Sequence, residues 1–175
     1  MTKTALRRQY PIVSESERLD SFDATYANEL DYVWRTLGRL GMPASDIADG
    51  VHDVFVVVYR KWEEIDHTRP VRPFLFGVAR RVAALARRKP RPESNNEADI
   101  IVEQPPHAER DWLWRSLAAL DEDRRAVFIL HDLEGYTGAE IAAILEIPAN
   151  TVHSRLRLAR ADLVAVHERL RGGAR

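Results

Sequence analysis

Apolar side chains recur at every third or fourth position through most of this 175-residue chain, and that spacing is the period of an amphipathic α-helix. Gly41, Pro43, Pro73 and Gly135 stand at the ends of the apolar stripes, where glycine and proline end or begin helices. The pattern therefore predicts an all-α fold. The stripes consist of Phe22, Tyr26, Leu30, Val33, Leu37 and Leu40; Val51, Val54, Phe55, Val58 and Trp62; Phe74, Leu75, Val78, Val82 and Leu85; Trp112, Leu113, Leu117 and Leu120; and Ala126, Val127, Leu130 and Leu133.

The β-branched run Val56, Val57 and Val58 lies inside the second stripe. Such residues favour a strand by propensity alone. Charged residues at Asp49 and Arg60 continue the helical pattern on both sides of the run. We therefore expect a helix at this position as well.

Charge is distributed unevenly along the chain, although its formal net charge is only -1. Residues 14–53 hold nine acids against three arginines, whereas residues 69–91 hold eight basic residues and no acid. The segment that follows contains several prolines and acids and little apolar periodicity, which is typical of a flexible linker. We predict an N-terminal tail at residues 1–19, two small helical domains at 20–90 and 110–175, and a flexible linker between them at 91–109.

The four residues Thr137 to Glu140 form a capping box, in which the threonine and glutamate side chains bind free backbone amides at a helix start. They predict a short helix that ends at Leu145. A tight turn at residues 146–148 and a longer helix that buries Val152 and Leu156 then follow. The C-terminal domain is therefore predicted to contain a helix-turn-helix.

The outer face of the second helix suits duplex DNA. Groove recognition needs short hydrogen-bonding side chains near the helix N-terminus and arginines that reach base edges. Asn150, His153, Ser154 and Arg157 meet this need. Arg155 and the nearby Arg160 are better placed for phosphates, which fix register without reading sequence. A helical hairpin with a merely solvated polar face is the alternative for this motif.

Residues 117–163, with the sequence LAALDEDRRAVFILHDLEGYTGAEIAAILEIPANTVHSRLRLARADL, resemble the C-terminal domain of the extracytoplasmic-function sigma factors of bacterial RNA polymerase. Residues 46–62 (DIADGVHDVFVVVYRKW) and 72–88 (RPFLFGVARRVAALARR) look like the core-binding helix and the minus-ten helix of the same family. The resemblance implies a two-domain promoter-recognition subunit without catalytic residues or cofactors. Its implied partners are core RNA polymerase, promoter DNA and, for many members, an anti-sigma factor.

The resemblance also implies a role for residues at three sites. The minus-thirty-five element would be read as duplex by Asn150, Thr151, His153, Ser154, Arg155, Arg157 and Arg160. The minus-ten element would be bound as melted non-template strand by His67, Arg69, Arg72, Arg80, Arg81, Arg87 and Arg88. Core polymerase would be bound by Asp46, Asp49, His52 and Asp53. Trp62, Phe74 and Phe76 are placed to stack on bases, but their helical spacing favours the core.

Several residues depart from the family pattern. His52 stands where glutamine is usual, and Arg81 and Leu85 stand where asparagine and aspartate are frequent. Asp121 replaces a proline, and Glu146 occupies a turn position that is commonly glycine. These departures leave the promoter sequence and the minus-ten contacts open.

Two other functions are compatible with parts of the chain. The pairs His52 with Asp53 and His131 with Asp132 resemble ligands of metal-dependent phosphohydrolases, but adjacent residues on a helix point about 100° apart. A stand-alone helix-turn-helix regulator that binds an operator explains the C-terminal half and leaves the acidic second helix unexplained.

The chain has no cysteine, which excludes disulfides and thiolate metal sites. It also has no long apolar run and no leader pattern, so we expect a cytoplasmic protein without membrane insertion.

Overall fold

The structure of the protein is a computed structural model that describes residues 15–88, 113 and 116–172. All regular secondary structure in these ranges is helical, as the apolar spacing predicts. The described residues form an N-terminal unit, residues 15–88, and a C-terminal unit, residues 113 and 116–172. The predicted linker at 91–109 lies outside the described residues.

The N-terminal unit consists of three long helices and one short turn. Helix α1 (Glu15–Arg39) is followed by α2 (Ala44–Arg60), by the 3₁₀ turn η1 (Trp62–Glu64) and by α3 (Arg72–Arg88). Because α1 begins at Glu15, the helix starts inside the segment predicted to be a tail. Leu37 of α1, Val54 of α2 and Phe76 of α3 are fully buried where the three helices meet.

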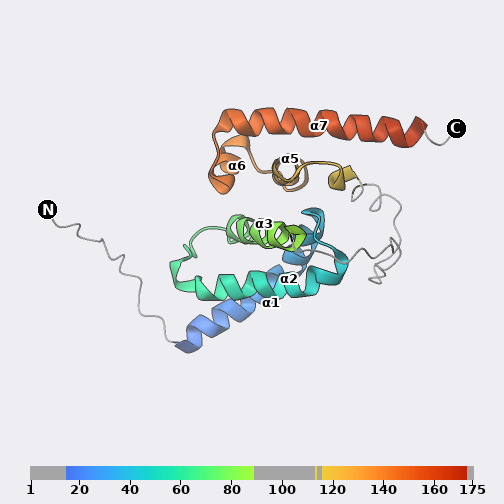
Figure 1. The fold of residues 1–175 in the computed structure, drawn as a ribbon. Coiled ribbons are helices and arrows are strands. Elements are labelled where there is room, and N and C mark those ends of the chain that lie inside the picture. The colour runs from blue at the N-terminus through green and yellow to red at the C-terminus, as the bar shows by residue number, and fades with distance from the viewer. Residues whose placement is uncertain (1–14, 89–112, 114–115, 173–175) are drawn as a thin grey trace.

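The C-terminal unit is built around one long outer helix. Residues 116–118 are helical and precede α5 (Glu122–Phe128), the π-helical turn η2 (Ile129–Leu133), α6 (Gly138–Leu145) and α7 (Ala149–Gly172). Figure 1 shows α7 along the outer edge of the molecule, with α5 and α6 between it and α3. The buried apolar side chains of both units belong to one continuous core.

Most predicted apolar positions are buried, and Tyr26, which is 41% exposed, and Leu85 are exceptions. Trp62 and Phe76 are in the core, as their spacing favours, and Phe74 is half-buried. Trp62 lies in η1 rather than in α2, which ends at Arg60. Leu85 is 62% exposed, so its prediction as a core residue is wrong. The nearby residues Ala83 and Ala86 of α3 face the hydrophobic core instead.

Gly41 makes the sharp turn between α1 and α2. Its φ of 84° lies in the left-handed region, where glycine has no Cβ to clash. The amide of Met42 donates to the Leu37 carbonyl at 3.0 Å and that of Gly41 to the Gly38 carbonyl at 2.8 Å, the two bonds of a Schellman motif. The turn exposes the carbonyl oxygen of Leu40 to the C-terminal unit.

Arg125 joins the two units through that carbonyl. Its side chain is buried, and its Nη1 donates to the Leu40 oxygen at 2.8 Å. Its Nη2 donates to the carbonyl oxygens of Leu120 at 2.8 Å and Ala118 at 3.1 Å. Burial, followed by the positive charge of Arg87, lowers the pKa of Arg125. The hydrogen bonds to carbonyls offset part of the cost of burying this cation, which forms no ion pair with a carboxylate among the described residues and whose Nε has no hydrogen-bond partner there.

A second contact between the units involves a buried carboxyl group. The hydroxyl of Tyr32 on α1 donates to Glu134 Oε2 at 3.0 Å, and both side chains are largely withdrawn from solvent. Burial raises the pKa of Glu134, and the Tyr32 hydrogen bond offsets only part of this shift. The other charged or titratable groups that act on the pair are Arg35, Arg39, Arg72 and Tyr136.

We expect Gly41→Ala to destabilise the protein. A Cβ at this position would lie 2.0 Å from Arg125 Nη1, and the left-handed backbone alone costs a side-chain-bearing residue about 1 to 2 kcal/mol. Gly77→Ala is the control, because no atom lies within 4 Å of its Cβ position in the middle of α3, and there alanine should stabilise the helix by about 0.5 to 1 kcal/mol. Denaturant unfolding measures both. Equal effects of the two substitutions would contradict the role given to Gly41.

We expect Glu134→Gln to stabilise the protein at neutral pH. A carboxyl whose pKa is raised by folding stabilises the native state below its ordinary pKa and loses that contribution as the pH rises through the raised value. Glutamine keeps an oxygen for the Tyr32 hydroxyl and cannot ionise. The unfolding temperature of the variant should therefore exceed that of the wild type at about pH 7, and the gap should close near pH 4. A gap that widens on acidification would contradict this account.

Candidate nucleic-acid interface

The helix-turn-helix begins at the predicted capping box. The amide of Thr137 donates to Glu140 Oε2 at 2.8 Å, and the amide of Glu140 donates to Thr137 Oγ1 at 3.3 Å. The hydrogen bonds from the backbone and then the side chain of Thr137 lower the pKa of Glu140, which keeps the carboxylate charged at the positive end of α6. Both predicted bonds of the capping box are confirmed.

The turn between α6 and α7 is set by one residue in an uncommon backbone conformation. Glu146 has a φ of 54°, in the left-handed region, and is the only described residue other than glycine with a positive φ. The amide of Ile147 then donates to the Ala142 carbonyl at 3.0 Å and closes α6. Val152 and Ala159 are fully buried on the inner face of α7. The predicted turn and the predicted inner face of the second helix are both present.

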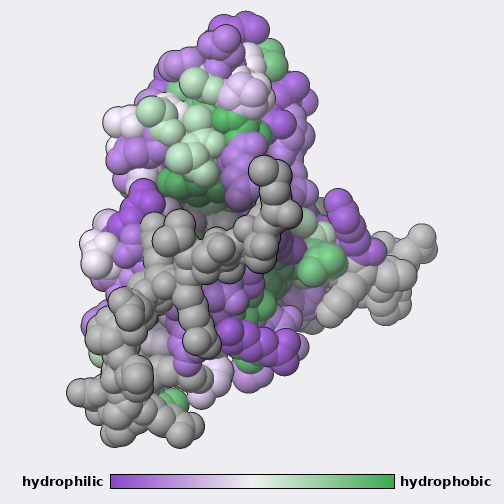
Figure 2. Space-filling model, turned by 90° about the vertical axis from the view of Figure 1, so that its left-hand side faces the viewer, coloured by the Kyte–Doolittle hydropathy of each residue, from purple (hydrophilic) through white to green (hydrophobic). Residues whose placement is uncertain are grey.

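Four predicted base-reading residues lie together on the outer face of α7. Asn150, His153, Ser154 and Arg157 are exposed within the first three turns of the helix. Ser154 Oγ donates to the Thr151 carbonyl at 3.0 Å. The face on which α6 and the start of α7 lie is seen in Figure 2, where hydrophilic side chains surround an apolar area in the upper part of the molecule.

The two predicted phosphate-binding arginines of α7 are engaged with carboxylates. Arg160 Nη2 lies 2.6 Å from Asp132 Oδ1. Burial on its own would raise the pKa of Asp132, but the hydrogen bonds from Arg160 and His131 lower it below its usual value. Arg155 forms an ion pair with Asp123 of α5. Arg155 is three-quarters buried, whereas about half of the Arg160 side chain stays exposed.

Helix α3 presents its predicted minus-ten arginines on two faces. Arg81 and Arg88 are exposed, with Leu85 between them on the same side of the helix. The side chains of Arg80 and Arg87 keep only 29% and 25% of their surface exposed, and both form ion pairs with acidic residues at the start of α5. The seven-residue spacing within each pair places its two members on one stripe of the helix. All four arginines were predicted to bind the minus-ten element, but only Arg81 and Arg88 are exposed in the structure.

The remaining minus-ten residues flank the start of α3. His67 hydrogen-bonds through Nε2 to the Trp62 carbonyl at 2.8 Å, and its ring packs against the indole at a centroid distance of 4.5 Å. Arg72 Nε lies 2.8 Å from Glu29 Oε2, and its guanidinium stacks 4.9 Å above the Tyr32 ring. Arg69 is exposed.

The predicted core-polymerase residues lie near the start of α2. Asp49, His52 and Asp53 are exposed and share one side of the helix, because they are three or four residues apart. Asp46 in the first turn accepts a hydrogen bond from Ser45 Oγ at 2.8 Å. The outer face of this helix is therefore acidic at its N-terminal end.

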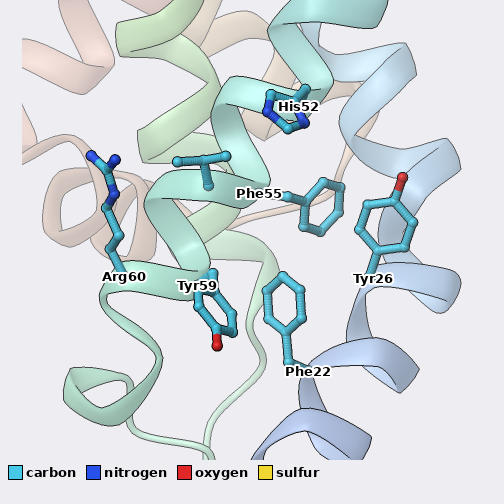
Figure 3. A pocket seen from close by; sticks show the side chains of 7 residues that line it. Phe22, Tyr26, His52, Phe55, Tyr59 and Arg60 are labelled. Carbon is cyan, nitrogen blue, oxygen red and sulfur yellow. The ribbon is translucent and has the colours of Figure 1, made fainter.

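An aromatic groove lies beside this acidic face, between α1 and α2 (Figure 3). Phe22 packs edge-to-face against Tyr59 and Trp62 at centroid distances of 5.1 and 5.3 Å, and Tyr26 lies 4.6 Å from Phe55. Tyr26 and Tyr59 remain substantially exposed. The groove is lined by Phe22, Tyr26, His52, Phe55, Val56, Tyr59 and Arg60.

The described part of the chain does not form the metal site that the two histidine–aspartate pairs would need. No group of three or more histidine, aspartate or glutamate side chains converges there as metal ligands would. His131 instead contacts its neighbour Asp132 at 3.2 Å, within the network of Arg160. Among the helices of residues 15–88 and 116–172, none combines the length and the apolar character needed to cross a bilayer.

Two acidic residues at the start of α5 were missed by the sequence reasoning. Glu122 Oε2 lies 2.8 Å from Arg87 Nη2, and Asp123 Oδ1 lies 2.6 Å from Arg80 Nη2. The preceding residue, Asp121, caps α5 by accepting from the amide of Arg124 at 2.9 Å. Three consecutive acids in a first helical turn are the signal that marks this segment as a candidate partner for the basic helix.

Comparison with known proteins matches residues 110–163 to the family model of sigma-70, region 4. The ECF RNA polymerase sigma-E factor of Escherichia coli is 28% identical over 138 residues, which cover 68% of this chain and 72% of that protein. The RNA polymerase sigma factor CnrH of Cupriavidus metallidurans is 28% identical over 152 residues, which cover 72% and 75% of the two chains.

Two solved structures share the fold. CnrH in complex with the cytosolic domain of CnrY has a TM-score of 0.66 and 25% sequence identity, and the match covers 87% of this chain and 91% of CnrH. The sigma factor RpoE from Bartonella quintana, in complex with the anti-sigma factor NepR, has a TM-score of 0.65 and 18% identity, with 85% and 98% of the chains covered.

Proposed function

The chain belongs to the extracytoplasmic-function (ECF) sigma factors of the sigma-70 family and as such directs transcription, and from this premise we propose how it reads a promoter. The start of α7 reads the minus-thirty-five element as duplex, whereas α3 and the loop before it bind the minus-ten element as melted non-template strand. Both surfaces act while the protein is bound to core RNA polymerase.

The observation that carries this proposal is the exposed outer face of α7. A helix fits the major groove, and side chains near its N-terminus reach the base edges. Asn150, His153, Ser154 and Arg157 project from this part of α7 without a carboxylate partner in the described structure, whereas the apolar face of the helix is buried. Arg157 is long enough to donate to a guanine edge, and Asn150 is suited to an adenine.

The minus-ten surface works by differential affinity rather than catalysis. A basic helix that binds single-stranded DNA better than duplex shifts the promoter toward its melted state. The exposed Arg81 and Arg88 supply phosphate contacts of this kind. Trp62 and Phe76 are buried in the hydrophobic core, so they are not available to stack on bases.

Core polymerase is proposed to bind the acidic side of α2. Asp49 and Asp53 are exposed there, and their charge suits a basic partner surface. The aromatic groove between α1 and α2 adjoins this surface through His52, which lines it. An anti-sigma factor is a further partner, because the solved structures of CnrH and RpoE hold such sigma factors with CnrY and NepR.

Run-off transcription with sigma-free bacterial core polymerase tests the proposal. Transcripts that appear only when this protein is added would support it, and alignment of their start sites would define both promoter elements. The control is Asp49→Lys with Asp53→Lys, which should lower transcription and co-migration with core polymerase together. Tight duplex binding without any protein-dependent transcript would indicate a stand-alone regulator instead.

We expect Arg157→Ala to change promoter preference at one position of the minus-thirty-five element. Loss of a bidentate arginine–base contact costs about 1 to 3 kcal/mol of discrimination at that base pair. Arg169→Ala is a matched control, because Arg169 is also exposed on α7 but lies several turns beyond the base-reading face. Selection from a library of promoters measures the preference, and an unchanged profile for Arg157→Ala would reject its role in base recognition.

A further inference from the structure

Leu85 is the most exposed of the large apolar side chains that the structure describes, because 62% of its surface is open to solvent. A single exposed leucine is common on protein surfaces, so its surroundings decide whether it indicates a contact. Arg81 lies four residues before it and Arg88 three residues after it, and both arginines are exposed on the same side of α3. Leu85 is therefore an apolar side chain between two cations.

The outer face of α3, which we define as the side opposite the buried Ala79 and Ala83, contains only arginines and apolar or small residues. Between residues 74 and 88 its members are Phe74, Gly77, Arg81, Ala84, Leu85 and Arg88. No side chain lies within 4 Å of the position that a Cβ of Gly77 would take, so the helix surface is open beside the arginines. This face has no carboxylate, amide or hydroxyl side chain, so it can bind a ligand only through arginine charge and apolar contact.

Leu85 points away from the contact between the two units. An α-helix turns about 100° per residue, so Leu85 lies about 140° and 160° around the axis from Arg80 and Arg87, the arginines that pair with α5. A ligand can therefore reach Leu85 in the arrangement that the structure shows.

Single-stranded DNA has both of the chemical groups that this face can bind. Its phosphates pair with arginines, and its unstacked bases offer apolar surface that a duplex hides. Thymine is the base that also carries a methyl group on its edge, and proteins recognise this group through apolar side chains. Residues 69–91 hold eight basic residues and no acid, so this part of the chain attracts a polyanion.

We propose that Leu85 is a specificity-determining residue of the minus-ten surface, where it packs against the C5 methyl group of a thymine in the melted strand while Arg81 and Arg88 bind phosphates on either side. The inference rests on the proposed function, because that function assigns α3 to the minus-ten element. It adds a base-specific contact to a surface whose arginines bind phosphates without regard to sequence.

The test compares binding of the full chain to oligothymidylate and to oligodeoxyuridylate of equal length, two single strands that differ only in the C5 methyl group. We expect the wild type to bind the thymidine strand about three- to fivefold more tightly, which is the gain from burying one methyl group. Leu85→Ala should lose this preference because it removes the apolar partner of the methyl group.

Val164→Ala is the matched control, because Val164 is also an exposed aliphatic residue, at 57%, and lies on α7 rather than on α3. Circular dichroism verifies folding. Leu85→Gln keeps the length of the side chain without its apolar end, should behave like Leu85→Ala, and replaces that variant if it fails to fold. An equal preference for thymidine in Leu85→Ala and Val164→Ala would overturn the inference.

A second measurement separates this inference from the proposed function. Run-off transcription with core polymerase uses promoters in which each thymine of the non-template minus-ten strand is replaced in turn by deoxyuridine. One replacement should lower transcription by the wild type and have no effect on transcription by Leu85→Ala. Protein-dependent transcription that responds to none of these replacements would retain the sigma function and reject the role of Leu85. A Leu85-dependent preference for thymidine without any transcript would retain the thymine contact and reject the sigma function.

Discussion

The buried guanidinium of Arg125 is the interaction on which the arrangement of the two described units depends. Its hydrogen bonds to carbonyl oxygens of Leu120 and Ala118 organise the start of the C-terminal unit, and its bond to Leu40 joins that unit to the α1–α2 turn. The turn accepts this approach because Gly41 has no Cβ there. A buried cation that is held by carbonyl oxygens tolerates few alternative geometries, because each lost carbonyl leaves desolvated charge behind.

This junction places the arginine stripe of α3 against the acidic first turn of α5. The side of α7 that carries Asn150, His153 and Arg157, which we propose to read bases, is exposed on the opposite side from this contact. On a polymerase that holds the units at a fixed separation, weak contacts from each would combine through effective concentration.

The local chemistry of the helices could be read from the sequence. Thr137 and Glu140 have capping-box spacing, Gly41 and Gly135 end helices, and the apolar stripes identify most of the core. Leu85 was misplaced because helical periodicity cannot separate the edge of an apolar face from its centre when alanines occupy the centre. The division of Arg80 from Arg81, and the pairing of Asp123 with residues 43 and 32 positions away, depend on tertiary packing that no local pattern records.

The central claim is that the Arg125 junction holds the two units together in the free chain, and we propose that binding to core polymerase separates them. The chain has no cysteine, so Ala48→Cys and Ala165→Cys, both at exposed helical positions, supply two unique sites for spin labels. The distance between the labels is measured by pulsed electron resonance in the free protein and in the complex with core polymerase and promoter DNA. The account predicts a single short distance in the free protein and a longer one in the complex. An identical distance in both states would contradict it.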